Sequence, residues 1–175
     1  MARKQTSEKQ ARSGSWVQVE GGPVLACIDM GTNSFHMIVC QASAELDHFE
    51  VSTKVKEAVP FFRRSLTAHY IDEVALEACI GILKDMRKRA YEKGADSIVA
   101  VATSAVRESR NGAEALSQIR EQLEIDARMI SGKEEARLIY LGVLWSMPKL
   151  KSVFGIVDIG GGSTEIIMGD RHAIT

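Results

Sequence analysis

Two segments of the 175-residue chain follow one pattern, VLACIDMGTNSFHMIVC at residues 24–40 and VFGIVDIGGGSTEIIMG at residues 153–169. Each consists of an apolar run, an aspartate, a short polar turn that contains glycine, and a second apolar run. Two short apolar runs around such a turn predict a β-hairpin. Aligned without a gap, the segments match Val24 with Val153, Asp29 with Asp158, Gly31 with Gly160, Ser34 with Ser163, and Ile38 with Ile167.

The two turns predict a site for a phosphorylated ligand. Backbone amides in a glycine-containing turn can point at phosphate oxygens with no side chain between them, and nearby hydroxyl groups add donors. Two such hairpins in one chain indicate a duplicated architecture in which the turns face each other. The candidate phosphate contacts are the residues of the two turns: Gly31, Thr32, Asn33, Ser34, Gly160, Gly161, Gly162, Ser163 and Thr164.

Composition argues against several classes of protein. The chain is 45% hydrophobic and 26% charged, which is typical of a globular protein. Its net charge of −1 disfavours a nucleic-acid-binding surface. No apolar stretch approaches the ~20 residues of a membrane-spanning helix, and no signal core follows the basic start. We therefore expect no nucleic acid and no membrane among its partners.

The three cysteines indicate a reducing compartment. Cys27, Cys40 and Cys79 are odd in number, widely spaced and set in apolar runs. This pattern predicts buried, reduced thiols rather than a disulfide framework or a metal site. We therefore expect a cytoplasmic protein.

The predicted elements follow the order of a ribonuclease-H-like lobe and the start of its duplicate. Strands at residues 24–30, 35–43 and 48–59 form an antiparallel meander. After it come a helix at residues 72–93, a strand at 97–102, a helix at 113–124, a strand at 128–130, a helix from 131 to Pro148, and the second hairpin. The fold class is α/β, with a mixed sheet of three antiparallel strands, then parallel strands, and flanking helices.

Two of the helices allow a prediction about burial. In the first, the apolar row Val74, Ala78, Ile82, Met86 and Ala90 is expected to cover the sheet. The helix before Pro148 is apolar almost all round, which predicts that it lies wedged between layers.

Three regions are expected along the chain. Residues 1–20 have few apolar residues and a basic excess, which predicts a disordered tail without function. Residues 21–148 form the first lobe, and residues 149–175 are the opening hairpin of a truncated second lobe. The hairpin residues Ile156, Val157, Ile166 and Ile167 would lack half of their packing partners, so we expect self-association through them.

Four segments in order resemble the exopolyphosphatase and guanosine pentaphosphate phosphatase family (Ppx/GppA): ACIDMGTNSFHMIV, ATSAVRES, ISGKEEARLIYLGV and VDIGGGSTEIIMG. This family is part of the actin, hexokinase and Hsp70 superfamily. The resemblance implies a phosphohydrolase, dependent on Mg²⁺ or Mn²⁺, that cleaves terminal phosphate from inorganic polyphosphate or guanosine pentaphosphate. It also implies that this chain is an N-terminal fragment with little activity of its own, and a homodimer is an expected assembly.

Hydrolysis of a phosphoanhydride needs a carboxylate that orients water and accepts its proton. Glu134 and Glu135 both lie in the first turn of a predicted helix, where the helix dipole favours acids, so spacing does not choose between them. The resemblance assigns the role to Glu135 and makes Glu165 a second acid near the cleft. Glu165 is also typical of an outward-facing strand residue.

The resemblance makes Asp29 and Asp158 the metal-binding acids, because related folds bind Mg²⁺ at these strand ends, directly or through water. Taken alone, Asp29 is also typical of an Asx turn that closes a hairpin. We expect His36, early in the second strand, to be a packed or sheet-face residue.

Arg107 follows a strand end, where a guanidinium can hold phosphate through two parallel hydrogen bonds. A surface ion pair with Glu108 or with a helix acid fits the same position. Thr103 and Asn33 are lesser candidate contacts.

One departure and two alternative functions remain. Where the family has a glycine-rich stretch, this chain has PFFRRSL at residues 60–66, in which Arg63 and Arg64 either contact a long anion or form a solvated turn. A kinase of the same superfamily, and a phosphate-binding or regulatory module without turnover, are the other functions that the sequence allows.

Overall fold

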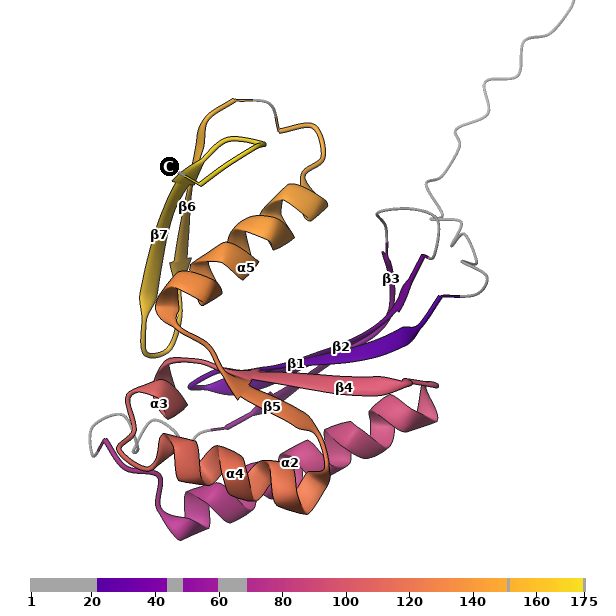
Figure 1. The fold of residues 1–175 in the computed structure, drawn as a ribbon, viewed down its shortest axis with the longest axis vertical. Helices are drawn as coiled ribbons and strands as arrows, with labels where there is room; N and C mark the ends of the chain where they lie inside the picture. Colours follow the sequence, from indigo (N-terminus) through magenta and orange to yellow (C-terminus); the bar gives the residue numbers. More distant parts are fainter. Residues whose placement is uncertain (1–21, 44–48, 60–68, 151, 175) are drawn as a thin grey trace, which may run out of the picture.

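The computed structural model of the chain describes residues 22–43, 49–59, 69–150 and 152–174. A five-stranded sheet has two long helices against one face, while a further helix and a two-stranded hairpin lie on its other side (Figure 1). The predictions for the tail at residues 1–20 and for PFFRRSL lie outside the described residues.

The five-stranded sheet has the order β3-β2-β1-β4-β5. Its antiparallel meander is formed by β1 (Val24–Met30), β2 (Ser34–Ala42) and β3 (Phe49–Ala58). Two further strands, β4 (Ser97–Ala102) and β5 (Asp126–Met129), run parallel to β1. The predicted ribonuclease-H-like α/β fold is confirmed, with strand ends displaced by one or two residues.

The hydrophobic core lies between this sheet and the helices α2 (Glu73–Glu92) and α4 (Gly112–Leu123) (Figure 1). Alternate residues of β1 and β2 point into it, as expected for strands buried on one face. These residues are at most 1% exposed: Ala26, Ile28, Met30, Phe35, Met37 and Val39. The residues that alternate with them, such as Cys27 and Asp29 of β1 and His36 of β2, therefore face the open side of the sheet.

The predicted ends of α2 are confirmed. The Asp72 side chain accepts a hydrogen bond from the Ala75 amide at 2.8 Å, which caps the helix. Gly94 follows the helix with φ of +81°, a conformation that favours glycine. The chain thus leaves α2 where the sequence predicted.

The buried face of α2 differs from the predicted one. Val74 is 76% exposed, whereas Leu83 is fully buried. A row with a strict spacing of four residues drifts by about 40° per step, so five such positions turn through about 160° and cannot all face one sheet. The residues that cover the sheet are Ala75, Leu76, Cys79, Leu83, Met86 and Ala90.

A short helix, α3 (Ser104–Arg107), occupies the segment after β4, which was predicted only as a polar connection. A Cβ atom at Gly112 would collide with the Val106 carbonyl oxygen, so the close approach of α4 to α3 requires glycine there. This packing fixes α3 at the carboxyl end of β4.

The second hairpin is present as β6 (Phe154–Ile159) and β7 (Thr164–Gly169), and α5 (Gly132–Ser146) packs on it. The Tyr140 hydroxyl donates to the Asp170 carbonyl oxygen at 2.7 Å. We refer to α5 with β6 and β7 as the hairpin unit. The prediction that α5 lies wedged between layers is wrong: α5 packs on the hairpin, and its Leu138, Leu141 and Trp145 side chains are 40–43% exposed.

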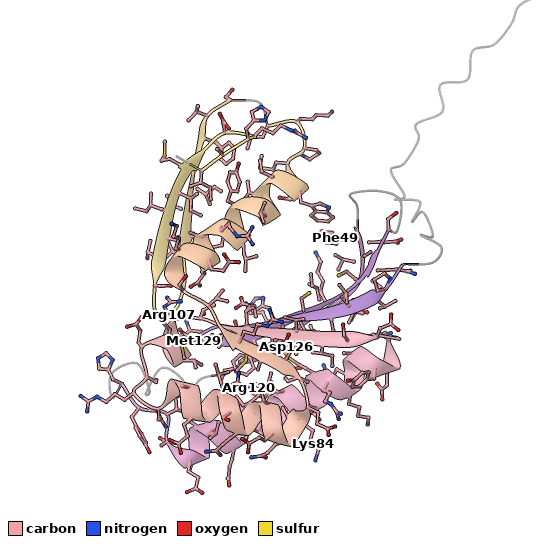
Figure 2. All side chains as sticks on the ribbon, viewed as in Figure 1. Phe49, Lys84, Arg107, Arg120, Asp126 and Met129 are labelled. Carbon is pink, nitrogen blue, oxygen red and sulfur yellow. The ribbon has the colours of Figure 1, made fainter. Side chains whose placement is uncertain are left out.

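The hairpin unit contacts the five-stranded sheet near both ends of α5. In the β6–β7 turn, a Cβ atom at Gly161 would lie 2.8 Å from Asn33 Cγ, so the two glycine turns touch. At the other end of α5, Trp145 stacks on Phe49 of β3, with ring centroids 4.3 Å apart and planes 12° from parallel (Figure 2). Between these contacts, the open side of the sheet faces the hairpin unit.

All three cysteines are free thiols. Cys40 and Cys79 are buried as predicted, but Cys27 is exposed, because it alternates with the core residues of β1 and faces the open side of the sheet. None of the helices in the described ranges combines the length and the apolar character that crossing a membrane requires.

Candidate functional site

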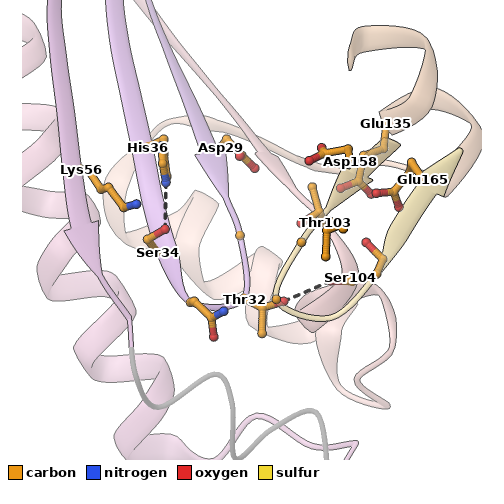
Figure 3. A pocket seen from close by; sticks show the side chains of 16 residues that line it. Asp29, Thr32, Ser34, His36, Lys56, Thr103, Ser104, Glu135, Asp158 and Glu165 are labelled. Carbon is orange, nitrogen blue, oxygen red and sulfur yellow. Dashed lines mark hydrogen bonds between the residues drawn. The ribbon is translucent and has the colours of Figure 1, made fainter. Parts of the chain in front are cut away.

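A cavity of about 430 Å³ opens where the two glycine turns meet (Figure 3). It lies between the ends of β1, β2 and β4, the start of α5 and the second hairpin. The predicted site residues that line it are Asp29, Gly31, Thr32, Asn33, Ser34, Thr103, Glu135, Asp158, Gly160, Gly161, Ser163 and Glu165.

Three predicted site residues do not line the cavity: Gly162, Thr164 and Arg107. Thr164 begins β7 with an exposed side chain. Four residues that were not predicted as site residues do line it: His36, Lys56, Ser104 and Ile159.

The β1–β2 turn is held in place by hydroxyl groups. Thr32 and Ser104 are each 3% exposed, and their side-chain oxygens share a hydrogen bond of 3.1 Å. Ser104 begins α3 at the end of β4, so this bond ties the turn to the neighbouring parallel strand. In the second turn, the Gly160 amide donates to the Ser163 carbonyl oxygen at 3.0 Å. This amide therefore closes the turn and is not directed at a ligand.

The two adjacent glutamates at the start of α5 point in different directions. Glu134 forms a two-point ion pair with Arg137 at 2.9 and 3.0 Å, and this pairing lowers the pKa of the Glu134 carboxyl group. Glu135 instead faces the cavity with a side chain that is 15% exposed. The Ser131 hydroxyl caps the helix by accepting from the Glu134 amide at 3.1 Å, which fixes this first turn.

Arg107, labelled in Figure 2, contacts Glu135 in the first turn of α5. Its guanidinium donates to the Glu135 carboxylate at 2.9 Å and to the Ile130 carbonyl oxygen at 3.1 Å. Glu108 lies 3.4 Å from the same group. Both ion pairs that the sequence left as alternatives, with Glu108 and with a helix acid, are therefore present.

Four carboxylates face the cavity, one from each of β1, α5, β6 and β7 (Figure 3): Asp29, Glu135, Asp158 and Glu165. Desolvation by neighbouring protein atoms raises the pKa of Glu135; Arg107 lowers it, and the charges of Glu165 and Asp29 raise it again. Asp29 is exposed to the cavity, yet desolvation also raises its pKa; His36 lowers it and Asp158 raises it. The negative charges of Asp29, Glu135, Asp158 and Glu165 therefore repel one another.

A hard divalent cation suits such a donor set, because carboxylate oxygens and water are the ligands that Mg²⁺ takes. Within the described ranges, no three His, Cys, Asp or Glu side chains converge closely enough to enclose a metal ion. A cation here would therefore complete its shell with water or with oxygens of the ligand.

Two of the cavity residues that were not predicted, Ser104 and His36, carry a local signal. Ser104 comes just after Thr103 at the end of a parallel strand, and His36 lies two residues after Ser34, on the same face of β2. The His36 imidazole Nε2 lies 2.8 Å from the Ser34 hydroxyl. Lys56 has no such signal, because it reaches the cavity only through the pairing of β3 with β2.

Comparison with known proteins gives one family. Residues 38–175 match the profile of the Ppx/GppA phosphatase family. A guanosine-5′-triphosphate,3′-diphosphate pyrophosphatase from Aeromonas hydrophila is 33% identical over 153 residues, which cover 87% of this chain and 30% of that protein.

Two solved structures share the fold over most of this chain. An exopolyphosphatase from Cytophaga hutchinsonii superposes with a TM-score of 0.79 and 32% identity, over 86% of this chain and 48% of that one. The Ppx/GppA family member from Aquifex aeolicus gives a TM-score of 0.75 and 25% identity, over 87% and 49%. The chain thus spans 30% of the curated relative and about half of each solved chain.

Proposed function

Because the chain belongs to the Ppx/GppA phosphatase family, we propose that it forms the first lobe of a phosphohydrolase that cleaves terminal phosphoanhydride bonds. The substrate class that we propose is inorganic polyphosphate, guanosine pentaphosphate, or both. The observation that supports this most is Glu135, a desolvated carboxylate that faces a cavity lined by two glycine turns.

Each group has a proposed role. The turns at residues 31–34 and 160–164 hold phosphate oxygens through amides and hydroxyls, with Thr103 as a further donor. Glu135 orients a water molecule and accepts its proton, and a raised pKa makes it a better base. Glu165 assists from the facing strand. A Mg²⁺ or Mn²⁺ ion held by Asp29 and Asp158 would neutralise charge on the phosphates.

The names of the relatives support the substrate class. The Aeromonas relative is named for guanosine-5′-triphosphate,3′-diphosphate, and the Cytophaga protein is named an exopolyphosphatase. Both names describe hydrolysis of linked phosphates. The chain covers under half of each of these proteins, so the activity, the homodimer and a cytoplasmic location are proposals for the whole protein.

The function is tested by substituting Glu135→Gln in the complete protein that carries this chain and measuring phosphate release from polyphosphate. We expect the rate to fall by about 10²- to 10⁴-fold, the usual contribution of a general base, with substrate affinity little changed. Glu134→Gln is the matched control, because Glu134 is paired with Arg137 and does not line the cavity.

Three outcomes contradict the proposal. Full activity of Glu135→Gln would show that Glu135 is not the general base. Equal losses of activity in Glu135→Gln and Glu134→Gln would indicate damage to α5 instead. Label from the terminal phosphate that appears on an acceptor other than water would identify a kinase.

The proposed cation makes a separate prediction. Chelation of divalent ions should stop phosphate release, and Mg²⁺ or Mn²⁺ should restore it. The ion should also raise the melting temperature, because it binds the folded state and relieves repulsion among the cavity carboxylates. In Asp158→Asn this thermal shift should shrink, and an unchanged shift would place the ion elsewhere.

For the 175-residue chain alone, we propose binding of polyphosphate with little turnover, because the chain spans 30% of the curated relative and about half of each solved chain. Titration calorimetry with polyphosphate and Mg²⁺ measures this. Turnover by the isolated chain at the rate of the complete protein would overturn it.

A further inference from the structure

The cavity has two chemically different ends. Carboxylates from α5 and the second hairpin lie at one end, whereas Lys56, His36 and Ser34 lie at the other (Figure 3). The acidic end contains the proposed base and cation ligands. At the basic end, Lys56 and His36 have no role in the chemistry described so far.

Lys56 belongs to a row of side chains across three neighbouring strands. It pairs with His36 of β2, and His36 pairs with Asp29 of β1. Register partners point to the same face of a sheet, so all three face the open side. Strands lie about 4.8 Å apart, which puts the Lys56 and Asp29 backbones roughly 10 Å apart.

Lys56 forms no ion pair within the described part of the chain, where no carboxylate oxygen lies within 4.0 Å of its ammonium group. Its neighbour Glu57 turns to the other face and binds Arg89 at 3.0 Å. The Lys56 side chain is exposed and lines the cavity. A cation placed in this way is available to an anionic ligand.

A single phosphate cannot contact both ends of this row. A chain of linked phosphates can place its terminal group among the acids and the cation while the following groups extend over β2 and β3. Those groups keep their negative charge, and Lys56 is the cationic side chain that lines the cavity there, with the His36 imidazole, which can donate a hydrogen bond, beside it.

We propose that Lys56, with His36 beside it, forms a subsite for the phosphates that are not cleaved, and that this subsite selects chains of linked phosphates over single phosphates. The proposal rests on the proposed function for the identity of the acidic end. It adds a recognition element that the glycine turns do not supply, because they hold only the phosphate next to them.

Binding of tripolyphosphate and of inorganic phosphate to the complete protein, measured by calorimetry with Mg²⁺, tests the subsite. Lys56→Gln should weaken tripolyphosphate binding about tenfold, the usual value of one charge-assisted contact, and leave phosphate binding within about twofold. Lys56→Arg should retain most of the affinity.

Lys54→Gln is the matched control. Lys54 lies two residues away on β3 and is also exposed, so its substitution by glutamine removes the same charge. It pairs with Ile38, however, and does not line the cavity. The affinity of Lys54→Gln for tripolyphosphate should stay within about twofold of that of the unsubstituted protein.

The outcomes separate this inference from the proposed function. Equal affinities for Lys56→Gln and Lys54→Gln would overturn the subsite, whatever the catalytic rate, and so would the absence of any tripolyphosphate binding. A selective loss in Lys56→Gln in a protein that releases no phosphate would support the subsite and refute the hydrolase.

Discussion

Arg107 and Glu135 show how one residue can act through another. Their side chains are 20% and 15% exposed, and their ion pair is the most enclosed of those in the described chain. A second bond to the Ile130 carbonyl oxygen fixes the guanidinium in place. This geometry supports a positioning role for Arg107 toward Glu135, in addition to the predicted phosphate contact, which stays a prediction.

Substitution of Arg107 should change the pH dependence of catalysis. Burial raises the pKa of Glu135 and Arg107 lowers it, so Arg107→Gln leaves desolvation and the charges of Glu165 and Asp29 unopposed. The base must be deprotonated to work. The acid limb of the kcat/KM profile should therefore move to higher pH, and by less in Arg107→Lys.

A role limited to phosphate binding predicts a different result. In that case Arg107→Gln would raise KM and leave the acid limb where it is. The pH profile thus distinguishes positioning of the base from contact with substrate.

Among the structural elements, the contact between the two glycine turns is the most sensitive to substitution. A Cβ atom at Gly161 would lie 2.8 Å from Asn33 Cγ and 3.1 Å from Thr32 Cβ. Gly161→Ala should therefore lower the free energy of unfolding in urea by about 1–3 kcal/mol, as overpacking usually does. Truncating the neighbour in Asn33→Ala/Gly161→Ala should recover much of this loss.

Gly81→Ala is the control for that substitution. Gly81 lies inside α2 with nothing within 4 Å of the added atom, so alanine should stabilise the chain by up to about 1 kcal/mol. If Gly161→Ala is as stable as the unsubstituted chain, the two turns do not touch in solution.

The same elements show what sequence patterns can and cannot predict. Strand order, helix ends and the pairing of the two turns follow from local signals such as the Asp72 cap and the repeated glycine turns. The face that α2 buries was misjudged because a four-residue row drifts around the helix. The exposure of α5 and of Cys27 depends on which layers of the fold cover them. A local sequence pattern does not contain this information.

Site residues divide in a similar way. Those at strand ends, such as Asp29 and Thr103, are predictable because turns and strand ends meet at one edge of the sheet. Lys56 was missed since its position depends on strand register. The Arg107 pair was only one of several alternatives, because the local sequence does not determine which acid the guanidinium reaches.

For the molecule as a whole, the outer face of the second hairpin is exposed and apolar. Val157 and Ile166 are register partners that are 62% and 75% exposed, and Ile159 and Met168 lie on the same face. Exposed apolar patches on strands favour association. Of the four residues that the sequence predicted to lack packing partners, Val157 and Ile166 are exposed, whereas Ile167 is buried and Ile156 is half-buried. We expect the 175-residue chain to self-associate through the exposed face in sedimentation experiments.

Ile166→Lys should shift this chain toward the monomer. Val74→Lys is the matched control, because Val74 is 76% exposed but lies alone on α2, away from the hairpin. A monomeric unsubstituted chain, or equal effects of both changes, would contradict association through the hairpin.

The stack of Trp145 on Phe49 gives the protein a native optical reporter. Separation of the rings would move the indole into water and shift its fluorescence to longer wavelength. The chain has two tryptophans, and Trp16 lies outside the described residues, so Trp16→Phe would leave the emission to Trp145 alone. Approach and separation of the hairpin unit and the sheet can therefore be followed in real time, without a label, while ligand is added.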